Sequence, residues 1–259
     1  MDRNKTIAAL AESEEERLLL VRVCDKLERA RDRDIPAASC FLSPRQQALL
    51  RQLLPDCGFF GGTEGAERCM AFVLPEYLTA EDFFEDGPIA CLRGSFYEAE
   101  AVGHRDVLGA LMGAGIRRDA VGDICIHGKT CDIFIQSELT RYLLDNLSSA
   151  GRHHMQLEQI SLDRAEKLPQ ELKEIRATVS SLRLDSIIAA GFHLSRGAAV
   201  EAVAAGRAAV NSLTTLKPDR PVQALDEISV RGLGKLRVLE VGGNTRKGRI
   251  ALVLGRFLG

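Results

Sequence analysis

Apolar residues of this 259-residue chain change their spacing along the sequence, and one type of secondary structure cannot satisfy both spacings. Between residues 18 and 27 they recur at the spacing of an amphipathic helix. Between residues 124 and 135 isoleucines recur at every second position on both sides of Gly128-Lys129, which predicts a β-hairpin with a two-residue turn. With 46% hydrophobic residues the chain can bury a sizeable core. We therefore expect an α+β fold and not a single helical bundle.

Two helices and a strand are expected in the first part of the chain. Ser13 and Glu16 have the spacing of a capping box at the start of the first helix. The second helix starts at Ser43 and ends by Pro55, because proline cannot continue it. The apolar run 69–74 then predicts a buried strand.

The middle of the chain alternates between strand and helix patterns. Strands are expected at 89–92 and 153–160, on either side of the hairpin in sequence. One helix is expected over 106–114, and a second is expected to be capped by Ser137. Together these elements predict a small α+β layer.

The C-terminal part predicts a two-helix hairpin packed on a small β-sheet. Ser181 is the expected cap of the first helix, with Gly191 just beyond its last turn, where a positive φ is often needed. Ser195 is the expected cap of the second helix, which ends at Gly206. Strands are expected at 209–212, 228–231, 235–241 and 250–254.

Three parts of the chain follow from these patterns. Residues 1–74 form an N-terminal helical and α+β region, 75–178 a central α+β domain with a connector, and 179–259 a C-terminal domain. Residues 161–178, rich in Glu, Lys and Arg, are interpreted as that solvated connector.

Charge is distributed unevenly between these parts. The whole chain has 34 basic and 36 acidic residues, a net charge of -2. From Ser181 onward there are twelve Lys or Arg and six Asp or Glu, so this segment carries +6 and the first 180 residues carry -8. A basic terminal segment favours a polyanionic partner such as RNA.

The seven cysteines lie in the first half of the chain without a paired CxxC pattern, as expected of reduced thiols in a cytoplasmic protein. The first residues have no apolar stretch long enough for a signal peptide, and no run of about 18 apolar residues occurs. We expect neither secretion nor a membrane partner.

The C-terminal part contains, in order, the strings Leu182–Asp185, Ser195-Arg196, Gly206-Arg207 and Val210-Asn211. Their order and spacing resemble a known RNA-binding domain, the S-four-type domain or alpha-L motif. Further segments resemble the YlmH family in particular: Asp226–Lys235, Thr245–Arg249, His104–Met112, Gly115–Arg118 and Gly122–Ile124. The resemblance is strongest over 103–124 and 181–258 and weak over the first 55 residues.

This resemblance implies N-terminal helices, a central α+β domain and a C-terminal S-four-type domain. It also implies an RNA-binding protein on large ribosomal subunits obstructed by peptidyl-tRNA, in ribosome-associated quality control. The partners implied are ribosomal RNA, tRNA or peptidyl-tRNA, and the large subunit. We expect a monomer.

Candidate RNA ligands are the cations and polar residues of the C-terminal domain, since each neutralised phosphate releases counterions. They are Arg183, Ser195, Arg196, Arg207, Asn211, Arg231, Lys235, Arg237, Thr245, Arg246, Lys247 and Arg249. Asp185 is interpreted as structural, either an orienting partner for a neighbouring arginine or a helix-start charge, and not as a base. The segment 211–214 has no Lys or Arg where many S-four-type domains are more basic, so modest affinity is expected from this domain alone.

A second RNA contact is expected around the central helix, at His104, Arg105, Arg117 and Arg118. A capped helix with surface arginines explains these residues equally well. Both interpretations stay open.

No catalytic residue, cofactor or metal is expected. Gly243–Arg249 resembles a phosphate loop but has Arg249 and Ile250 where Lys and Ser or Thr belong. His104-Arg105-Asp106 resembles a kinase catalytic loop, but no DFG follows it. Cys125, His127 and Cys131 lack a fourth zinc ligand.

The leading hypothesis is therefore a non-enzymatic RNA-binding protein that acts in rescue or quality control of stalled translation. Two alternatives stay open: an RNA-modifying enzyme that its C-terminal domain delivers to RNA, and a ribosome-assembly factor that docks through its acidic N-terminal part.

Overall fold

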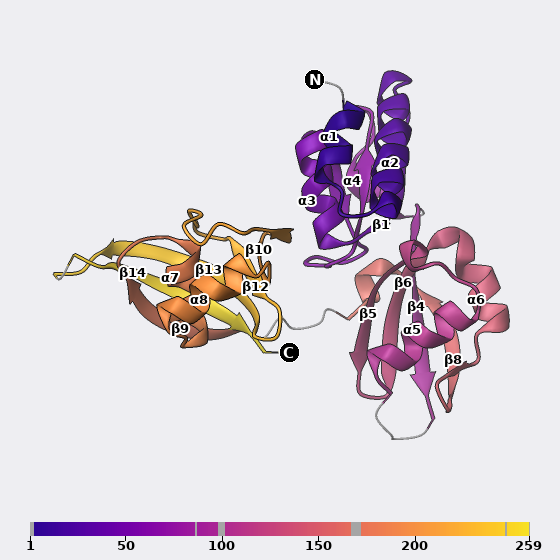
Figure 1. Cartoon of the computed structure of the whole chain (residues 1–259). Coiled ribbons are helices and arrows are strands. Elements are labelled where there is room, and N and C mark those ends of the chain that lie inside the picture. The colour runs from indigo at the N-terminus through magenta and orange to yellow at the C-terminus, as the bar shows by residue number, and fades with distance from the viewer. Residues whose placement is uncertain (1–2, 86, 98–101, 167–171, 247, 259) are drawn as a thin grey trace. The chain divides into compact units, whose positions relative to one another are not determined.

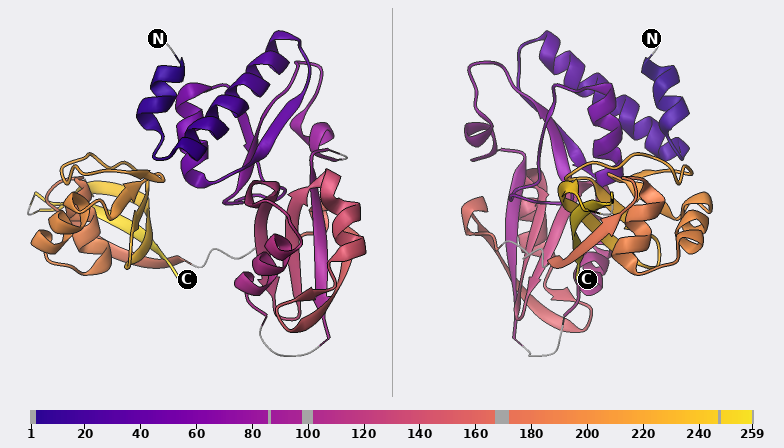
Figure 2. Two further views of the ribbon diagram at one scale, coloured as in Figure 1. Left: turned by 45° about the vertical axis from the view of Figure 1, so that its right-hand side comes forward. Right: turned by 90° about the vertical axis from the view of Figure 1, so that its left-hand side faces the viewer.

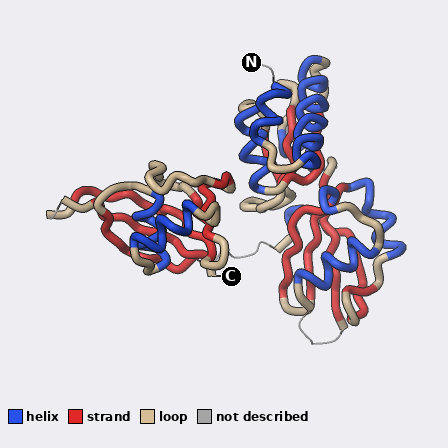
Figure 3. Tube along the Cα trace, viewed as in Figure 1, coloured by secondary structure: helices blue, strands red, loops and turns tan. Residues whose placement is uncertain are grey.

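The computed structural model describes residues 3–85, 87–97, 102–166, 172–246 and 248–258. The chain divides into two compact units, Met1–Leu168 and Pro169–Gly259, each described here by itself (Figure 1). Both are mixed α+β structures, as predicted (Figure 3). The first has helices at its N-terminus and two sheets, the second has one sheet, and the paired strands in all three are antiparallel.

The first unit has three helices near its N-terminus; the starts of the second and third follow the predicted caps, and the first was not predicted. They are α1 (Arg3–Leu10), α2 (Glu14–Asp32) and α3 (Pro44–Leu53). The Ser13 side chain accepts a hydrogen bond from the backbone of Glu16, and Ser43 forms a complete capping box with Gln46. These contacts lie within one helical turn, which is why the sequence predicts them correctly.

A three-stranded sheet in the order β1-β3-β2 accompanies these helices, with β1 between α2 and α3 in the chain. Its strands are β1 (Ala37–Leu42), β2 (Gly58–Phe60) and β3 (Cys69–Val73), and a short helix, α4 (Ala80–Glu85), comes after them. The predicted strand at 69–74 is thus confirmed as β3.

A five-stranded sheet forms the rest of the first unit, in the order β5-β6-β4-β8-β7. Its strands are β4 (Ile89–Phe96), β5 (Val121–His127), β6 (Thr130–Gln136), β7 (Ser149–Ala150) and β8 (His153–Ile160). The helices are α5 (His104–Gly113) and α6 (Thr140–Asn146), with single turns at Arg118–Ala120, Ser137–Leu139 and Leu162–Arg164. The predicted hairpin is present, with His127 paired to Thr130 across Gly128-Lys129.

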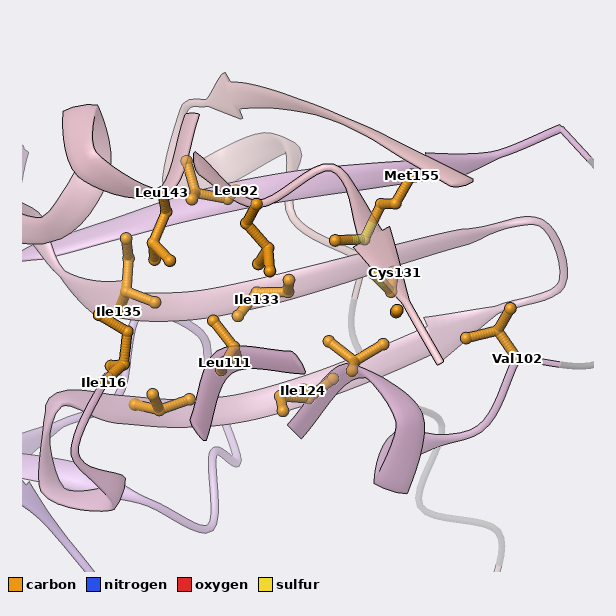
Figure 4. Packing of buried hydrophobic residues seen from close by; sticks show 14 of the residues in the cluster. Leu92, Val102, Leu111, Ile116, Ile124, Cys131, Ile133, Ile135, Leu143 and Met155 are labelled. Carbon is orange, nitrogen blue, oxygen red and sulfur yellow. The ribbon is translucent and has the colours of Figure 1, made fainter. Parts of the chain in front are cut away.

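Apolar side chains fill both faces of this five-stranded sheet. On one face, Leu111 of α5 and Leu143 of α6 pack against isoleucines of β5 and β6 (Figure 4). On the other, Phe134 packs in a cluster with Phe41 and Met70 of the three-stranded sheet, all at most 1% exposed. The two sheets of the first unit therefore share a core.

The second unit is a six-stranded sheet, in the order β11-β10-β12-β13-β14-β9, with two helices packed on it (Figure 2). Its strands are β9 (Leu172–Val179), β10 (Ala208–Val210), β11 (Leu213–Thr214), β12 (Glu227–Val230), β13 (Gly234–Asn244) and β14 (Ile250–Phe257). The helices are α7 (Leu184–Phe192) and α8 (Arg196–Ala204). Ile187 and Ile188 of α7 are fully buried against Leu236 and Leu254 of the sheet.

Three expectations about the second unit are wrong. Residues 172–178, expected as part of a solvated connector, form strand β9, which pairs with β14 along its whole length. The cap of α7 is Arg183 and not Ser181. Gly191 lies inside α7, and the left-handed residue after the helix is His193, with φ 55°.

Two further expectations are wrong in detail. Ser137 does not cap α6; it begins a single 3-10 turn, and Leu139 occupies the cap position of the helix. Asn211 and Ser212, expected in a strand, have φ angles of 50° and 65° and form the two-residue turn between β10 and β11. Positive φ at both central residues is what a type I′ hairpin turn requires.

The seven cysteines are reduced and all but Cys40 are buried. Burial raises the pKa of Cys24, Cys69 and Cys131 to about 11 and that of Cys91 to about 12. The described residues contain no group of three or more His, Cys, Asp or Glu placed to hold a metal ion. Within the same residues no single helix is long and apolar enough to cross a membrane; α7 and α8 pass such a test only as a pair, bent by 119°.

Candidate nucleic-acid interface

A buried carboxylate joins two of the predicted RNA ligands at the helical hairpin. Asp185 Oδ1 lies 3.2 Å from Arg183 Nε, and Asp185 Oδ2 lies 3.3 Å from Arg196 Nε. The Asp185 side chain is 1% exposed, whereas those of Arg183 and Arg196 are 39% and 60% exposed. The aspartate thus anchors two arginines that reach the surface, which confirms its predicted orienting role.

The electrostatics of Asp185 follow from this arrangement. Burial by itself raises the pKa of the carboxyl group, but hydrogen bonds from Arg183 and Arg196, together with their charges, outweigh burial. The pKa of Asp185 is therefore below its ordinary value, and the carboxylate is charged at neutral pH.

Arg207 and Arg231 lie together at the other end of α8. Ser195 caps the start of the helix through a hydrogen bond from the Ala198 backbone, and Gly206, with φ 67°, follows its end. Arg207 comes next, and its carbonyl accepts a hydrogen bond from the Arg231 backbone at 2.9 Å. Both arginines are exposed. Within the described part of the chain no ion pair engages either side chain.

Lys235 and Arg237 share one carboxylate on the sheet face opposite the helices. Lys235 Nζ lies 3.2 Å from a carboxylate oxygen of Glu227, and Arg237 also pairs with Glu227. Both cations lie over the ring of Phe257, at 5.0 and 5.2 Å from its centroid. Burial raises the pKa of Glu227, but the two cations outweigh it, so the pKa lies below its ordinary value.

Asn211 has a role in the fold of the β10–β11 turn. Its amide oxygen accepts from the Glu227 backbone at 2.9 Å, and its amide nitrogen donates to Asp226 at 2.7 Å. Its side chain is therefore already engaged within the unit.

The remaining candidates lie at the turn between β13 and β14. The hydroxyl of Thr245 accepts from the Arg249 backbone at 3.1 Å. The Arg249 guanidinium donates to the hydroxyl of Thr178 on β9 at 3.0 Å, while Arg246 is exposed. Lys247 lies outside the described residues. The predicted ligands thus form separate groups around the unit and not one cluster.

The four candidates of the central domain lie at opposite ends of α5. His104 and Arg105 are exposed in its first turn, where Asp106 accepts a hydrogen bond from the Gly103 backbone. Arg117 pairs with Asp119 beyond the other end of the helix. Arg118 donates to the carbonyl oxygen of Val121 at 2.6 Å, so it supports the fold.

An ion pair, Arg93–Asp132, and a set of side-chain to backbone hydrogen bonds at Asp123 and Arg68 were not predicted from the sequence. Arg93 donates through two nitrogens to Asp132, both bonds at 2.7 Å. Asp123 accepts from the backbone of Glu67 and Arg68, and the Arg68 guanidinium donates to the carbonyl oxygen of Val121 at 3.0 Å. Each contact joins residues far apart in the sequence, so no local pattern marks them.

An open groove of about 680 Å³ along β8 was also missed. The Tyr97 side chain is 74% exposed, and its hydroxyl donates to the amide oxygen of Gln156 at 2.8 Å. The lining residues are Tyr97, Leu144, Leu147, Ser148, Arg152, His154, Met155, Gln156 and Leu157. None of these residues was predicted to bind RNA, because the sequence signals for RNA binding were clusters of charged residues.

Comparisons with known proteins bear on both units. A family described as "Putative RNA-binding domain in YlmH" matches residues 97–164. The chain is 33% identical over 213 residues to "Ribosome-associated protein quality control protein P2" of Bacillus subtilis (strain 168), which covers 80% of this chain and 82% of that protein. The solved structure titled "Cell division protein ylmH from Streptococcus pneumoniae" has a similar fold, with a TM-score of 0.51 and 21% identity over 61% of this chain and 98% of that one.

Proposed function

This chain belongs to the YlmH family, and from this premise we propose that it is a non-enzymatic RNA-binding protein that acts on the ribosome in quality control of stalled translation. The observation that carries the proposal is the similarity to a ribosome-associated quality control protein, which runs through most of both chains. Action on ribosomes places the proposed role in the cytoplasm.

The second unit is proposed to be an S-four-type domain that grips RNA through its phosphates. The segment from Ser181 onward carries +6, as twelve basic and six acidic residues. The support for this assignment is the pair of short helices α7 and α8 followed by a small sheet, with Arg183, Arg196 and Arg207 at the helix boundaries. Guanidinium groups donate to phosphate oxygens in a two-bond geometry, which suits this task.

The candidate ligands are expected to differ in their contribution. Arg207 and Arg231 are exposed and adjacent, so they are proposed as the main phosphate contacts of the second unit. Lys235 and Arg237 share Glu227, which offsets part of their charge. Arg183 and Arg196 are held by Asp185 and are proposed to contact RNA in that fixed orientation.

The central domain is proposed to supply a second RNA contact, since the RNA-binding family matches residues 97–164. His104 and Arg105 are the exposed candidates there, whereas Arg118 is engaged with backbone carbonyls. Ribosomal RNA and tRNA are the proposed partners, with peptidyl-tRNA on the large subunit as the proposed target.

Sedimentation of a cell lysate tests the proposal. The native chain is expected to comigrate with large subunits that carry peptidyl-tRNA, and to dissociate as salt rises, because phosphate contacts release counterions. The variant Arg207→Glu/Arg231→Glu is expected to lose comigration. Lys26→Glu/Arg29→Glu, which makes the same change of charge at exposed positions of α2, is the matched control and is expected to comigrate.

Other results would replace the proposal. If the native chain stays in the soluble fractions and a modified nucleotide depends on it, an RNA-modifying enzyme is the better interpretation. If the native chain binds only immature ribosomal subunits, a ribosome-assembly factor is the better interpretation.

A further inference from the structure

We propose that the groove along β8 binds a nucleotide of unpaired RNA, with its base against the ring of Tyr97 and its phosphate at Arg152. This inference rests on the proposed function and names a site within it. All nine residues that line the groove lie within the segment 97–164, which matches the RNA-binding family.

Tyr97 is placed for stacking. It follows the last residue of β4, next to the end of the β4–β8 ladder, where Ser95 pairs with Gln156 and Phe96 with Met155. Its hydroxyl is held by Gln156 while the side chain stays 74% exposed. Because its hydroxyl is already held, the exposed ring can stack on a base with little further loss of side-chain conformational entropy.

The rest of the lining fits one nucleotide. Leu144, Leu147 and Met155 offer apolar surface for a flat base, and Ser148, His154 and Gln156 offer hydrogen-bonding groups for its edge. Arg152 contributes a positive charge, and none of the nine lining residues is acidic. This combination of one aromatic ring, one arginine and uncharged polar groups is what single-stranded RNA sites use.

The bound nucleotide is unpaired, because stacking on the ring of Tyr97 requires an open base face. In an A-form duplex the bases stack on one another and their edges are paired, so a tyrosine cannot lie against a base face. Loops, bulges and ends leave base faces open.

A peptide strand is the rival occupant of the groove. One edge of β8 pairs with β4 over Met155–Ile160, and the other pairs with β7 only at His153 and His154, which leaves the rest of that edge without a strand partner among the described residues. Such a sheet edge can accept an added strand. The charge of the lining and the RNA-binding family match both favour RNA over a peptide.

Binding of a fluorescent single-stranded oligoadenylate to the full-length chain, followed by anisotropy, tests the site. Tyr97→Ala is expected to weaken binding about 5- to 100-fold, as loss of one stacked base implies. Tyr97→Phe keeps the ring and is expected to weaken it less. Tyr77→Ala is the matched control, since Tyr77 is 73% exposed and lies outside the groove, and it is expected to bind as the native chain does.

A duplex RNA of the same length provides the second measurement. The Tyr97 variants are expected to bind it as the native chain does, because the phosphate contacts of the second unit are unchanged, and an unchanged thermal melt shows that their first unit is folded. Unchanged oligoadenylate binding by Tyr97→Ala would overturn the groove site. Hydrogen exchange of β8 that slows with a strand-forming peptide but not with oligoadenylate would overturn it in favour of a peptide ligand.

The sedimentation experiment separates this inference from the function on which it rests. Salt-sensitive comigration of the native chain with large subunits, together with no effect of Tyr97→Ala on oligoadenylate binding, would overturn the groove site and leave the proposed function. Absence of comigration and of binding to either RNA would overturn both.

Discussion

Arg196 at the start of α8 is tied to Asp185 in the first turn of α7, with 3.3 Å between Nε and Oδ2. The pair spans the bend of the helical hairpin, and Asp185 also accepts a hydrogen bond from the Ser186 backbone at 2.8 Å. Because the carboxylate is buried and the guanidinium is exposed, the aspartate sets the geometry while the arginine faces the surface.

Asp185→Asn is expected to lower the local unfolding free energy of α7 and α8 by about 1–3 kcal/mol, because charged hydrogen bonds to two arginines are lost. The three tyrosines, Tyr77, Tyr97 and Tyr142, all lie in the first unit, and the chain has no tryptophan. Intrinsic fluorescence therefore does not report on the second unit, and hydrogen exchange of the peptides over 184–204 in rising urea is the suitable measurement. Asp219→Asn, at an exposed position of the same unit, is the control and is expected to change little.

The stability of the second unit is expected to fall in acid. The pKa values of Asp185 and Glu227 are lower in the folded chain than their ordinary values. The stability that these two carboxylates give to the second unit is therefore fully present above their pKa values in the unfolded chain, about 3.9 for Asp and 4.3 for Glu. It is lost as the pH falls through their pKa values in the folded chain. Circular dichroism melts between about pH 6 and pH 3 are expected to show a smaller acid-induced loss in Asp185→Asn than in the native chain. Equal losses would contradict the role given to Asp185.

Two glycines of the helical hairpin are expected to respond in opposite ways to alanine. A Cβ at Gly191 would lie 2.3 Å from Leu236 Cδ1, and Leu236 is fully buried, so Gly191→Ala is expected to cost about 1–3 kcal/mol of stability. A Cβ at Gly197 would meet nothing closer than 4.0 Å, so Gly197→Ala is expected to stabilise α8 by up to about 1 kcal/mol. The same exchange measurement compares them. Equal effects of the two changes would refute the packing argument.

The salt dependence of RNA binding is expected to distinguish a cation without an ion pair among the described residues from a cation that shares a carboxylate. Arg207→Gln is expected to reduce the slope of log K against log salt by about 1, the value for one phosphate contact. Lys235→Gln is expected to reduce it less, because Lys235 shares Glu227 with Arg237. Binding of a labelled hairpin RNA at several salt concentrations gives both slopes. A larger effect at Lys235 would place the main contact on the opposite sheet face.

Local signals in the sequence predicted those parts of the fold that short contacts determine. The caps at Ser13, Ser43 and Ser195 act within one turn, and the hairpin at Gly128 depends on adjacent residues. The predicted pairing of Asp185 with a neighbouring arginine is confirmed for Arg183, which is close in sequence; the second contact, with Arg196, joins the two helices and was not predicted.

Contacts between distant segments account for the errors. The sequence around Gly191 has the pattern of a helix end. In the structure Gly191 lies inside the helix, where the lack of a Cβ lets Leu236 of β13 pack closely, and the residue with left-handed φ is His193. The charged residues of β9 resemble a connector, since only the β14 ladder makes that segment a strand. Similarly, the sequence does not show that Tyr97 borders a groove; the engagement of Arg118 with the carbonyl oxygens of Val121 and Gly122 is local but depends on how the chain turns there.

The burial of the thiols has a practical consequence for labelling. With a pKa of about 11, a cysteine is thiolate in only about one molecule in ten thousand at neutral pH, and the thiolate is the species that maleimides and peroxide attack. All seven native cysteines lie in the first unit, so the second unit carries none. A cysteine introduced at an exposed position such as Asp219 would therefore take a fluorophore ahead of the six buried thiols, so that only Cys40 needs prior replacement.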